Sequence, residues 1–245
     1  MKFVKLIILV SVLLYSCQRE EVPADSSQNC NLVKEVSHGD SSMYTYDSQN
    51  RVVYNHHANS PDDDVRYTYG TNSMTMEAVD TVTKYSKQLF TYDANKNIIQ
   101  AKYFHYFRSP MYSQIRRMGL TNNKVTSDSL FDSTLHLIEV ATYTWNGDNM
   151  VKYVSPDMTV EFQYDLSKTS SAGDFVWENL MNDSDVWFYS PVKNLITGYK
   201  ITYRYGSVYT LAANYVFDSN GRITSVTTTD SDSDTVTTYY SYQCQ

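Results

Sequence analysis

The stretch YVFDSNGRITSV, residues 215–226, sets the pattern that decides the fold. Two aromatic residues stand two positions apart, an aspartate follows directly, and an apolar residue returns after a short polar run. Residues two apart share one face of a β-strand, and Asp, Asn and Gly favour turns. We therefore predict a hairpin in which the aromatic couple ends one strand and the apolar residue begins the next.

Seven such couples occur along the chain, each followed by Asp, Asn or Gly. They are Tyr44-Thr45-Tyr46-Asp47, Tyr67-Thr68-Tyr69-Gly70, Phe90-Thr91-Tyr92-Asp93, Tyr143-Thr144-Trp145-Asn146, Phe162-Gln163-Tyr164-Asp165, Tyr203-Arg204-Tyr205-Gly206 and Tyr215-Val216-Phe217-Asp218. The longer units begin at irregular spacings, whereas propeller blades repeat at a fixed period. We predict an all-β fold, an irregular antiparallel meander of about 13 to 16 strands that forms a curled or barrel-like sheet.

One segment departs from the strand pattern. Phe175, Val176, Leu180 and Met181 recur near helical spacing, and Asp174 is a suitable cap. We predict one short helix near residues 174–188 that the curled sheet covers. An irregular lid loop is the alternative.

The N-terminus has the order of a lipoprotein signal. Two lysines precede an apolar run at residues 6–14, which is shorter than the roughly 20 residues needed to span a bilayer. Leu14-Tyr15-Ser16-Cys17 resembles the lipobox of bacterial lipoproteins, although Tyr15 stands where small residues are usual. The resemblance implies cleavage before Cys17 and a covalent lipid on Cys17, with no other cofactor. An ordinary secretory signal with an incidental cysteine is the alternative.

The residues after Cys17 indicate a second targeting signal. Glu20 and Glu21 follow closely, which resembles the surface-export signal of Bacteroidota lipoproteins, and a plain solvated tether is the equal alternative. We expect a signal peptide at 1–16 that is removed, a lipidated flexible tether at 17–29 and a single Tyr-rich β domain at 30–245. The expected location is the cell envelope, as an outer-membrane lipoprotein, with exposure at the cell surface left open.

The charge of the mature chain limits its partners. Removing residues 1–16 takes away two lysines and leaves 18 Lys and Arg against 27 Asp and Glu, a net charge of −9. Nucleic acids and anionic lipids are bound through basic patches. We therefore exclude nucleic acid as a partner and expect contact with the membrane through the lipid anchor alone, with the oligomeric state left open.

No motif in the sequence predicts catalysis. Gly39-Asp40-Ser41 matches a triplet of some lipid-ester hydrolases, which also need a late Asp-x-x-His. The nearest match runs from Asp132 to His136, one residue too long, and the α/β scaffold of those enzymes is lacking. We interpret the triplet as a hairpin turn.

Metal binding is not predicted either. His56 and His57 are adjacent, so on a strand they point to opposite faces and cannot chelate one ion together. The run 62–64 and the alternating Asp230, Asp232 and Asp234 are acidic but lack the calcium-loop pattern. Solvated loop tips are the favoured interpretation of both.

The two remaining cysteines stand at the ends of the β domain. An oxidising envelope would let Cys30 and Cys244 form a disulfide if the first and last strands lie side by side. By the chain-entropy model such a long loop would stabilise the fold by about 5 kcal/mol. Two unpaired thiols at frayed ends are the alternative.

The layout also resembles known families. The hairpin units, of which YTYDSQNRVV at residues 44–53 is one, resemble the tyrosine-aspartate repeats of cell-surface shell proteins. The whole resembles a family of Bacteroidota lipoproteins with a porin-like fold, whose proline-containing connector is matched by residues 190–196, SPVKNLI. This resemblance implies a fold and an envelope location, and no activity.

Two functions are compatible with these observations. The first is a non-enzymatic binding or accessory module for a glycan, polymer or protein ligand, because outward-facing Tyr and Trp rings could stack on sugars. The alternative is an envelope hydrolase, of glycans or esters, with catalytic carboxylates or His on loops. We favour the binding module.

Overall fold

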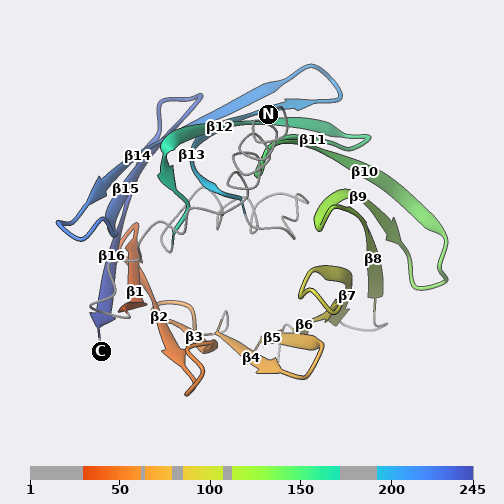
Figure 1. Ribbon diagram of the computed structural model, residues 1–245, viewed down its shortest axis with the longest axis horizontal. Helices are drawn as coiled ribbons and strands as arrows, with labels where there is room; N and C mark the ends of the chain where they lie inside the picture. Colours follow the sequence, from red (N-terminus) through yellow and green to blue (C-terminus); the bar gives the residue numbers. More distant parts are fainter. Residues whose placement is uncertain (1–29, 62–63, 79–84, 107–111, 172–191, 245) are drawn as a thin grey trace, which may run out of the picture. The chain divides into compact units, whose positions relative to one another are not determined.

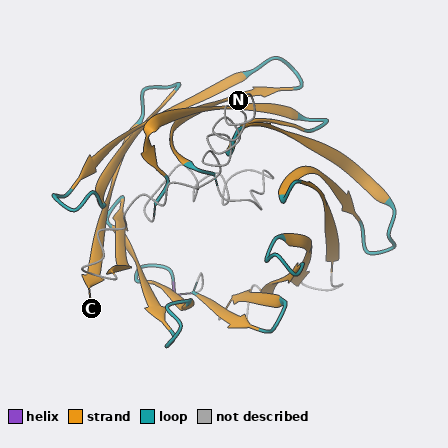
Figure 2. Ribbon diagram, viewed as in Figure 1, coloured by secondary structure: helices purple, strands orange, loops and turns teal. Residues whose placement is uncertain are grey.

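The computed structural model describes residues 30–61, 64–78, 85–106, 112–171 and 192–244, and every regular element in these ranges is a strand (Figure 2). The sixteen strands are β1 Cys30–Ser37, β2 Asp40–Tyr46, β3 Val52–His57, β4 Val65–Tyr69, β5 Ser73–Ala78, β6 Tyr85–Tyr92, β7 Ile98–Tyr106, β8 Tyr112–Thr121, β9 Lys124–Phe131, β10 Leu137–Asn146, β11 Asn149–Val154, β12 Met158–Thr169, β13 Asn194–Tyr203, β14 Val208–Phe217, β15 Ile223–Asp230 and β16 Thr235–Cys244. The helix predicted near 174–188 falls at residues 172–191, outside the described ranges.

The strands form one closed antiparallel barrel in chain order, with β1 beside β16 (Figure 1). Across that seam the Thr238 hydroxyl donates to Ser37 Oγ over 3.1 Å. The predicted all-β meander and its strand number are therefore confirmed, and the curled sheet closes fully. We call the end of the barrel where β1 begins the terminal rim and the other end the opposite rim.

An aspartate holds each of five hairpin loops in the same conformation. In the loop that follows Phe217, the Asp218 carboxylate accepts hydrogen bonds from the backbone N–H groups of Asn220 and Arg222, at 2.8 and 3.0 Å. The Gly221 backbone between them has φ +78°, a left-handed conformation. The other four loops begin at Asp47, Asp93, Asp132 and Asp230.

Six of the seven aromatic couples lie at hairpin bends, as predicted. In the sixth couple, β13 ends at Tyr203, so Tyr205 belongs to the loop and is 92% exposed. The prediction is wrong for Phe162-Gln163-Tyr164-Asp165, which lies inside β12. There the Asp165 carboxylate binds the backbone N–H and hydroxyl of Ser167, and a register shift follows while the strand continues.

Aromatic side chains on six even-numbered strands bind the main chain of the preceding strand. Tyr215 Oη on β14, for example, donates to the Ile196 carbonyl on β13 over 2.8 Å. The other donors are Tyr46, Tyr69, Trp145, Tyr164 and Tyr242, whose acceptors are the carbonyls of Leu32, Val52, Val125, Met150 and Ile223.

Five of the six acceptors follow a register shift. Ile196, for example, pairs with Tyr164 directly after the ladder between β12 and β13 shifts. The same holds for Val52, Val125, Met150 and Ile223. A bulge disrupts the ladder locally and leaves backbone groups without their usual partners. The aromatic donor of the next strand satisfies such a carbonyl without leaving the buried face.

From β10 to β14 the wall carries a buried apolar row on one face and an exposed polar row on the other. A cross-strand row of Tyr143, Tyr153, Val160, Ile201 and Tyr209 runs over five neighbouring strands, and its first four members are at most 6% exposed. All sixteen strands lie in a single wall, so the strands supply no second layer on the convex side. Side chains this deeply buried therefore point into the barrel.

The neighbouring row on the other face is polar. It consists of Thr144, Lys152, Glu161, Lys200 and Thr210, paired in register across the same five strands. Glu161 lies between two lysines, and opposite charges in such cross-strand positions attract. The convex face of this part of the wall is thus built for contact with water.

A disulfide joins Cys30, the first residue of β1, to Cys244, the last residue of β16. Residues Asn31–Gln243 form one compact unit. The bond makes the chain between the two cysteines a covalent ring.

The aspartate loops predict how stability depends on pH. Hydrogen bonds donated by Arg222, first from its backbone N–H and then from its side chain, lower the pKa of Asp218. Side-chain and backbone hydrogen bonds lower the pKa of Asp47, Asp93 and Asp132. A carboxyl whose pKa is lower in the folded state stabilises the fold above its unfolded pKa of about 3.9, and this stabilisation is lost as pH falls through the folded value. Urea midpoints should therefore be level above about pH 5 and fall below about pH 4. The urea midpoint of Asp218→Asn should fall less steeply with decreasing pH than that of the wild type, and equal slopes for the two proteins would contradict this account.

Candidate functional site

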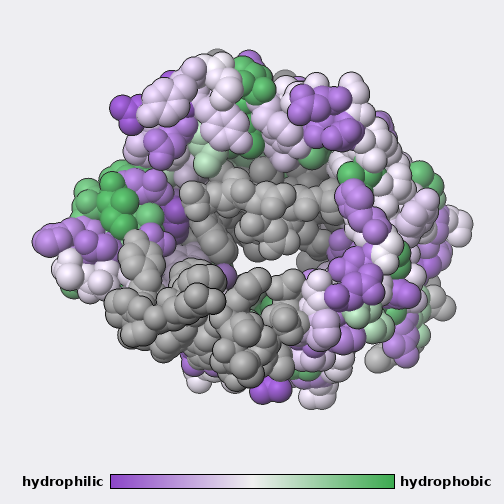
Figure 3. All heavy atoms as spheres, turned by 180° about the vertical axis from the view of Figure 1, so that it is seen from behind, coloured by the Kyte–Doolittle hydropathy of each residue, from purple (hydrophilic) through white to green (hydrophobic). Residues whose placement is uncertain are grey.

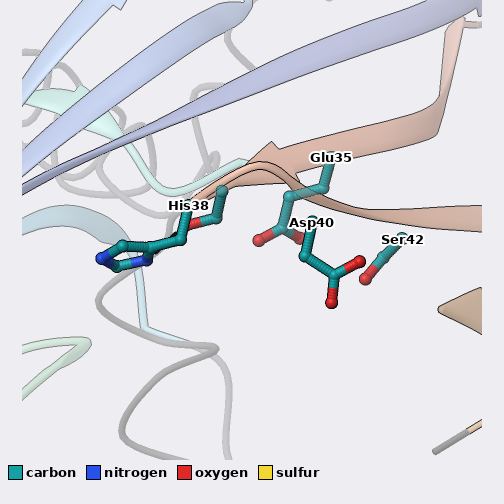
Figure 4. A pocket seen from close by; sticks show the side chains of 5 residues that line it. Glu35, His38, Asp40 and Ser42 are labelled. Atoms are coloured by element: carbon teal, nitrogen blue, oxygen red, sulfur yellow. Dashed lines mark hydrogen bonds between the residues drawn. The ribbon is translucent and has the colours of Figure 1, made fainter. Parts of the chain in front are cut away.

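A pocket lies at the opposite rim, where β1 turns into β2. Its volume is about 300 Å³, and it is lined by Glu35, Ser37, His38, Asp40 and Ser42 (Figure 4). Cross-strand pairs place Glu35 opposite Ser42 and Ser37 opposite Asp40. These four side chains therefore share one face of the hairpin.

The turn of this hairpin positions the pocket. His38 and Gly39 have φ of 51° and 78°, the two positive values of a type I′ turn, which favours Gly. The Asp40 Oδ1 atom accepts hydrogen bonds from the backbone N–H groups of Ser41 and Asn59, at 2.7 and 3.2 Å. The interpretation of Gly39-Asp40-Ser41 as a hairpin turn agrees with this geometry.

A serine of the pocket contacts a histidine. Ser42 Oγ lies 3.1 Å from His57 Nδ1, and His57 Nε2 lies 3.1 Å from Asn55 Nδ2. In this structure Asn55 presents its amide nitrogen to the ring, and an amide nitrogen can only donate. With the amide in that orientation, Nε2 of a neutral His57 accepts and Nδ1 carries the ring proton. His57 then donates to Ser42 Oγ, whereas a catalytic base has to accept the proton of the serine hydroxyl.

His56 binds a different group. Its Nδ1 lies 2.9 Å from Asp64 Oδ2, and the Asp64 carboxylate also accepts hydrogen bonds from Tyr54 Oη and from the His57 backbone N–H. The rings of His56 and His57 thus bind different groups, as their adjacency predicted. Asp64 is 5% exposed, so it differs from the solvated loop tip that we expected, because these donors replace its water. Residues 62 and 63 lie outside the described ranges.

A second charged cluster is buried in the wall of β8 to β10. Arg116, 3% exposed, binds the fully buried Asp128 over 2.8 Å and Glu139 over 3.2 Å. Tyr143 Oη donates to Asp128 Oδ2 over 2.5 Å, and burial, followed by the Asp128 charge, raises the pKa of Tyr143 well above its usual value. Every charge here has an opposite partner, which is the requirement for a stable buried ion network.

The other sequence candidates fall in several places. Cys17, Glu20 and Glu21 lie outside the described residues, so the lipid anchor and the export signal stay predictions. The Asp230 carboxylate accepts the backbone N–H groups of Asp232 and Asp234 and so shapes its own loop. Within the described part of the chain, no group of three or more His, Cys, Asp or Glu is arranged to hold a metal ion.

The aromatic couples give little support to a sugar-stacking platform. In the couple at Tyr143 and Trp145, both rings share the buried face, because residues two apart point the same way. The exposed tyrosines in the described ranges are Tyr203, Tyr205 and Tyr239.

The grouping of these five side chains into a pocket was not predicted from the sequence. Glu35 belongs to an alternating strand, and its period-two pattern could have shown that it shares a face with Ser37. Its position opposite Ser42 depends on the register of the hairpin, which the positive-φ turn at His38-Gly39 sets.

The fold is similar to that of porin-like proteins of known structure. A porin-like protein from Bacteroides uniformis matches with a TM-score of 0.54 and 10% sequence identity, over 87% of this chain and 95% of that chain. A porin-like protein from Bacteroides vulgatus matches with a TM-score of 0.45 and 13% identity, over 86% of this chain and 98% of that chain. The first likeness shows a porin-like barrel fold.

Other comparisons give no match. No family model matches this chain, so the resemblance to tyrosine-aspartate repeats has no support from a family. No curated protein matches it either. Among the described residues, no helix is long and apolar enough to cross a membrane.

The direction of the hydrogen bond between His57 and Ser42 predicts an unreactive serine. A fluorophosphonate probe should label the wild type no faster than Ser42→Ala, because His57 donates to Ser42 Oγ and does not take its proton. The measurement is the fraction of intact protein that carries the probe, by mass spectrometry. Labelling of the wild type that disappears in both Ser42→Ala and His57→Ala would show an activated nucleophile.

Proposed function

We propose that this chain is a lipid-anchored protein of the cell envelope whose barrel stands in water and binds a ligand. The barrel would not form a channel wall in the bilayer. Lipid on Cys17 would hold the chain at the membrane, and the tether at 17–29 would join the anchor to β1. The proposal includes an outer-membrane location, and Glu20 and Glu21 would direct export to the cell surface.

The observation that carries this proposal is the orientation of the two rows across β10 to β14. A transmembrane barrel has an apolar band outside and a polar interior. Here the buried row is led by Tyr143 and Tyr153, while the outer row carries Lys152, Glu161 and Lys200. A lysine facing lipid at the bilayer midplane costs about 2 to 4 kcal/mol, so a wall with two of them favours water.

The described end of the barrel is mixed in polarity. Seen from behind, along the barrel axis, hydrophilic and hydrophobic residues are interspersed over the described part of this end (Figure 3). Threonine pairs on the exposed side of β15 and β16 add to this polarity, with Thr227 and Thr237 in hydroxyl contact at 3.0 Å.

Binding is a better account of the pocket than ester hydrolysis. In the Nδ1–H tautomer of His57 the Ser42 hydroxyl accepts from the ring, and the lining carries two carboxylates, Glu35 and Asp40, which would repel the oxyanion of an acyl-transfer reaction. A non-enzymatic binding or accessory role is therefore our proposal, and the envelope hydrolase is the less favoured alternative.

The lipid anchor and the polar wall predict how the protein partitions. A Cys17→Ala variant, placed behind a signal that an ordinary signal peptidase removes, should stay in the aqueous phase without detergent, since lipid alone would hold the chain. The wild type should sediment with membranes and incorporate labelled palmitate. Partition after ultracentrifugation, with circular dichroism to verify folding, makes the comparison. A folded variant that still needs detergent would mean that the barrel itself enters the bilayer.

A further inference from the structure

The pocket at the β1–β2 hairpin is rich in hydrogen-bond acceptors. Glu35 and Asp40 are carboxylates, and none of the five lining residues is lysine or arginine. In Figure 4 the two carboxylates lie close to each other, with Ser42 beside Asp40. Such a lining attracts a ligand that is positively charged and supplies donors.

One carboxylate oxygen is poised to receive such a donor. The Asp40 Oδ1 atom is occupied by two backbone N–H groups, which fix the orientation of the carboxylate. No hydrogen bond from the described part of the chain reaches Oδ2, so this oxygen has a lone-pair side open to a ligand. Tyr44 Oη donates to Glu35 Oε2 over 3.0 Å and so positions the second carboxylate.

A buried amide oxygen near the pocket also lacks a hydrogen-bond donor within the described part of the chain. Asn55 is 9% exposed, and among the described residues its Oδ1 atom has no hydrogen-bond partner. Asn55 is not one of the five lining residues, but it stands opposite Tyr44 in the ladder, on the face of the wall that carries the pocket. A buried polar atom without a partner costs free energy unless a bound group satisfies it.

The shape and chemistry of the lining suit an ammonium group. An ammonium has three diverging N–H donors and no acceptor, and it suits acceptors contributed by β1 and β2 from different directions, whereas a guanidinium requires a coplanar arrangement. The hydroxyls of Ser37 and Ser42 can both donate and accept, so they suit hydroxyl groups beside the ammonium. A volume of about 300 Å³ is at the lower end for ligand pockets and fits a single small ring.

We propose that this pocket binds a small ligand that carries a primary ammonium group beside hydroxyl groups, as an amino sugar does. The inference rests on the proposed binding function and names the ligand class of its site. Glu35 and Asp40 neutralise the ammonium, while Ser37 and Ser42 bind the adjacent hydroxyls.

Glucosamine and glucose test this proposal, because glucose is nearly the same size and carries an uncharged hydroxyl where glucosamine carries its ammonium group. The full-length chain, purified in a non-ionic detergent, is titrated with each sugar, and the affinity is measured by saturation-transfer NMR at pH 6.5. Glucosamine should bind at least tenfold more tightly, because the hydroxyl lacks the charge and two of the three donors. Equal affinities for the two sugars, or no binding of glucosamine, would overturn the proposal.

Charge-neutral variants locate the site. Glu35→Gln and Asp40→Asn keep an acceptor oxygen for Tyr44 or for the Ser41 backbone, and each should weaken glucosamine binding about tenfold. Glu161→Gln, which removes the same charge from the outer row, is the matched control and should bind as the wild type does. Equal loss in all three variants would place the effect in the overall charge and overturn the proposal.

The two proposals can fail separately. A barrel that stays in water without its lipid but ignores glucosamine would overturn the ligand class alone. A barrel that needs detergent after removal of the anchor would overturn the proposed function, whatever the sugars do.

Discussion

The barrel depends on one recurring interaction, in which an aromatic side chain on an even-numbered strand donates a hydrogen bond to a main-chain carbonyl of the strand before it. Tyr215 and Ile196 are one example, and Trp145 and Val125 another. The ring buries apolar area on the inner face while its polar tip satisfies a carbonyl beside a bulge. β8 departs from this rule, because it carries Leu120, which has no donor, at the equivalent position although a register shift between β6 and β7 precedes Ile98. No register shift occurs between β4 and β5, so β5 offers no such carbonyl to β6.

This interaction sets which face of the sheet is buried inside the barrel. The other face is therefore the outer surface, and its chemistry decides whether the barrel can stand in water or in a bilayer. Because the aromatic couples point inward, the alternate positions are free for Thr, Lys and Glu. We propose that a barrel with that outer face stands in water and is held at the membrane by its lipid anchor. Its functional groups then concentrate at a rim, where the turn at His38-Gly39 brings Glu35 and Asp40 together.

Much of the fold could be predicted from the sequence because the signals are local. An aromatic couple followed by Asp predicts a strand and its turn, since both depend on neighbours within about five residues. The predicted hairpin bend was wrong at Phe162-Gln163-Tyr164-Asp165. An Asp that begins a hairpin loop and an Asp beside a bulge have the same local sequence, and only the pairing with the partner strand distinguishes them. The pocket and the buried Arg116–Asp128 pair could not be predicted, because both depend on cross-strand register.

The central claim is that the apolar face of the sheet lines the inside of the barrel and the polar face is exposed to water. Cysteine accessibility in the membrane-tethered protein tests this claim most directly. Single cysteines would replace Ala141 and Val160 on the buried face and Thr142 and Glu161 on the exposed face, with Cys30 and Cys244 left in their disulfide. A charged maleimide added without detergent should label positions 142 and 161 and leave 141 and 160 unlabelled until the protein is unfolded. Protection of 142 and 161 with labelling of 141 and 160 would contradict the account.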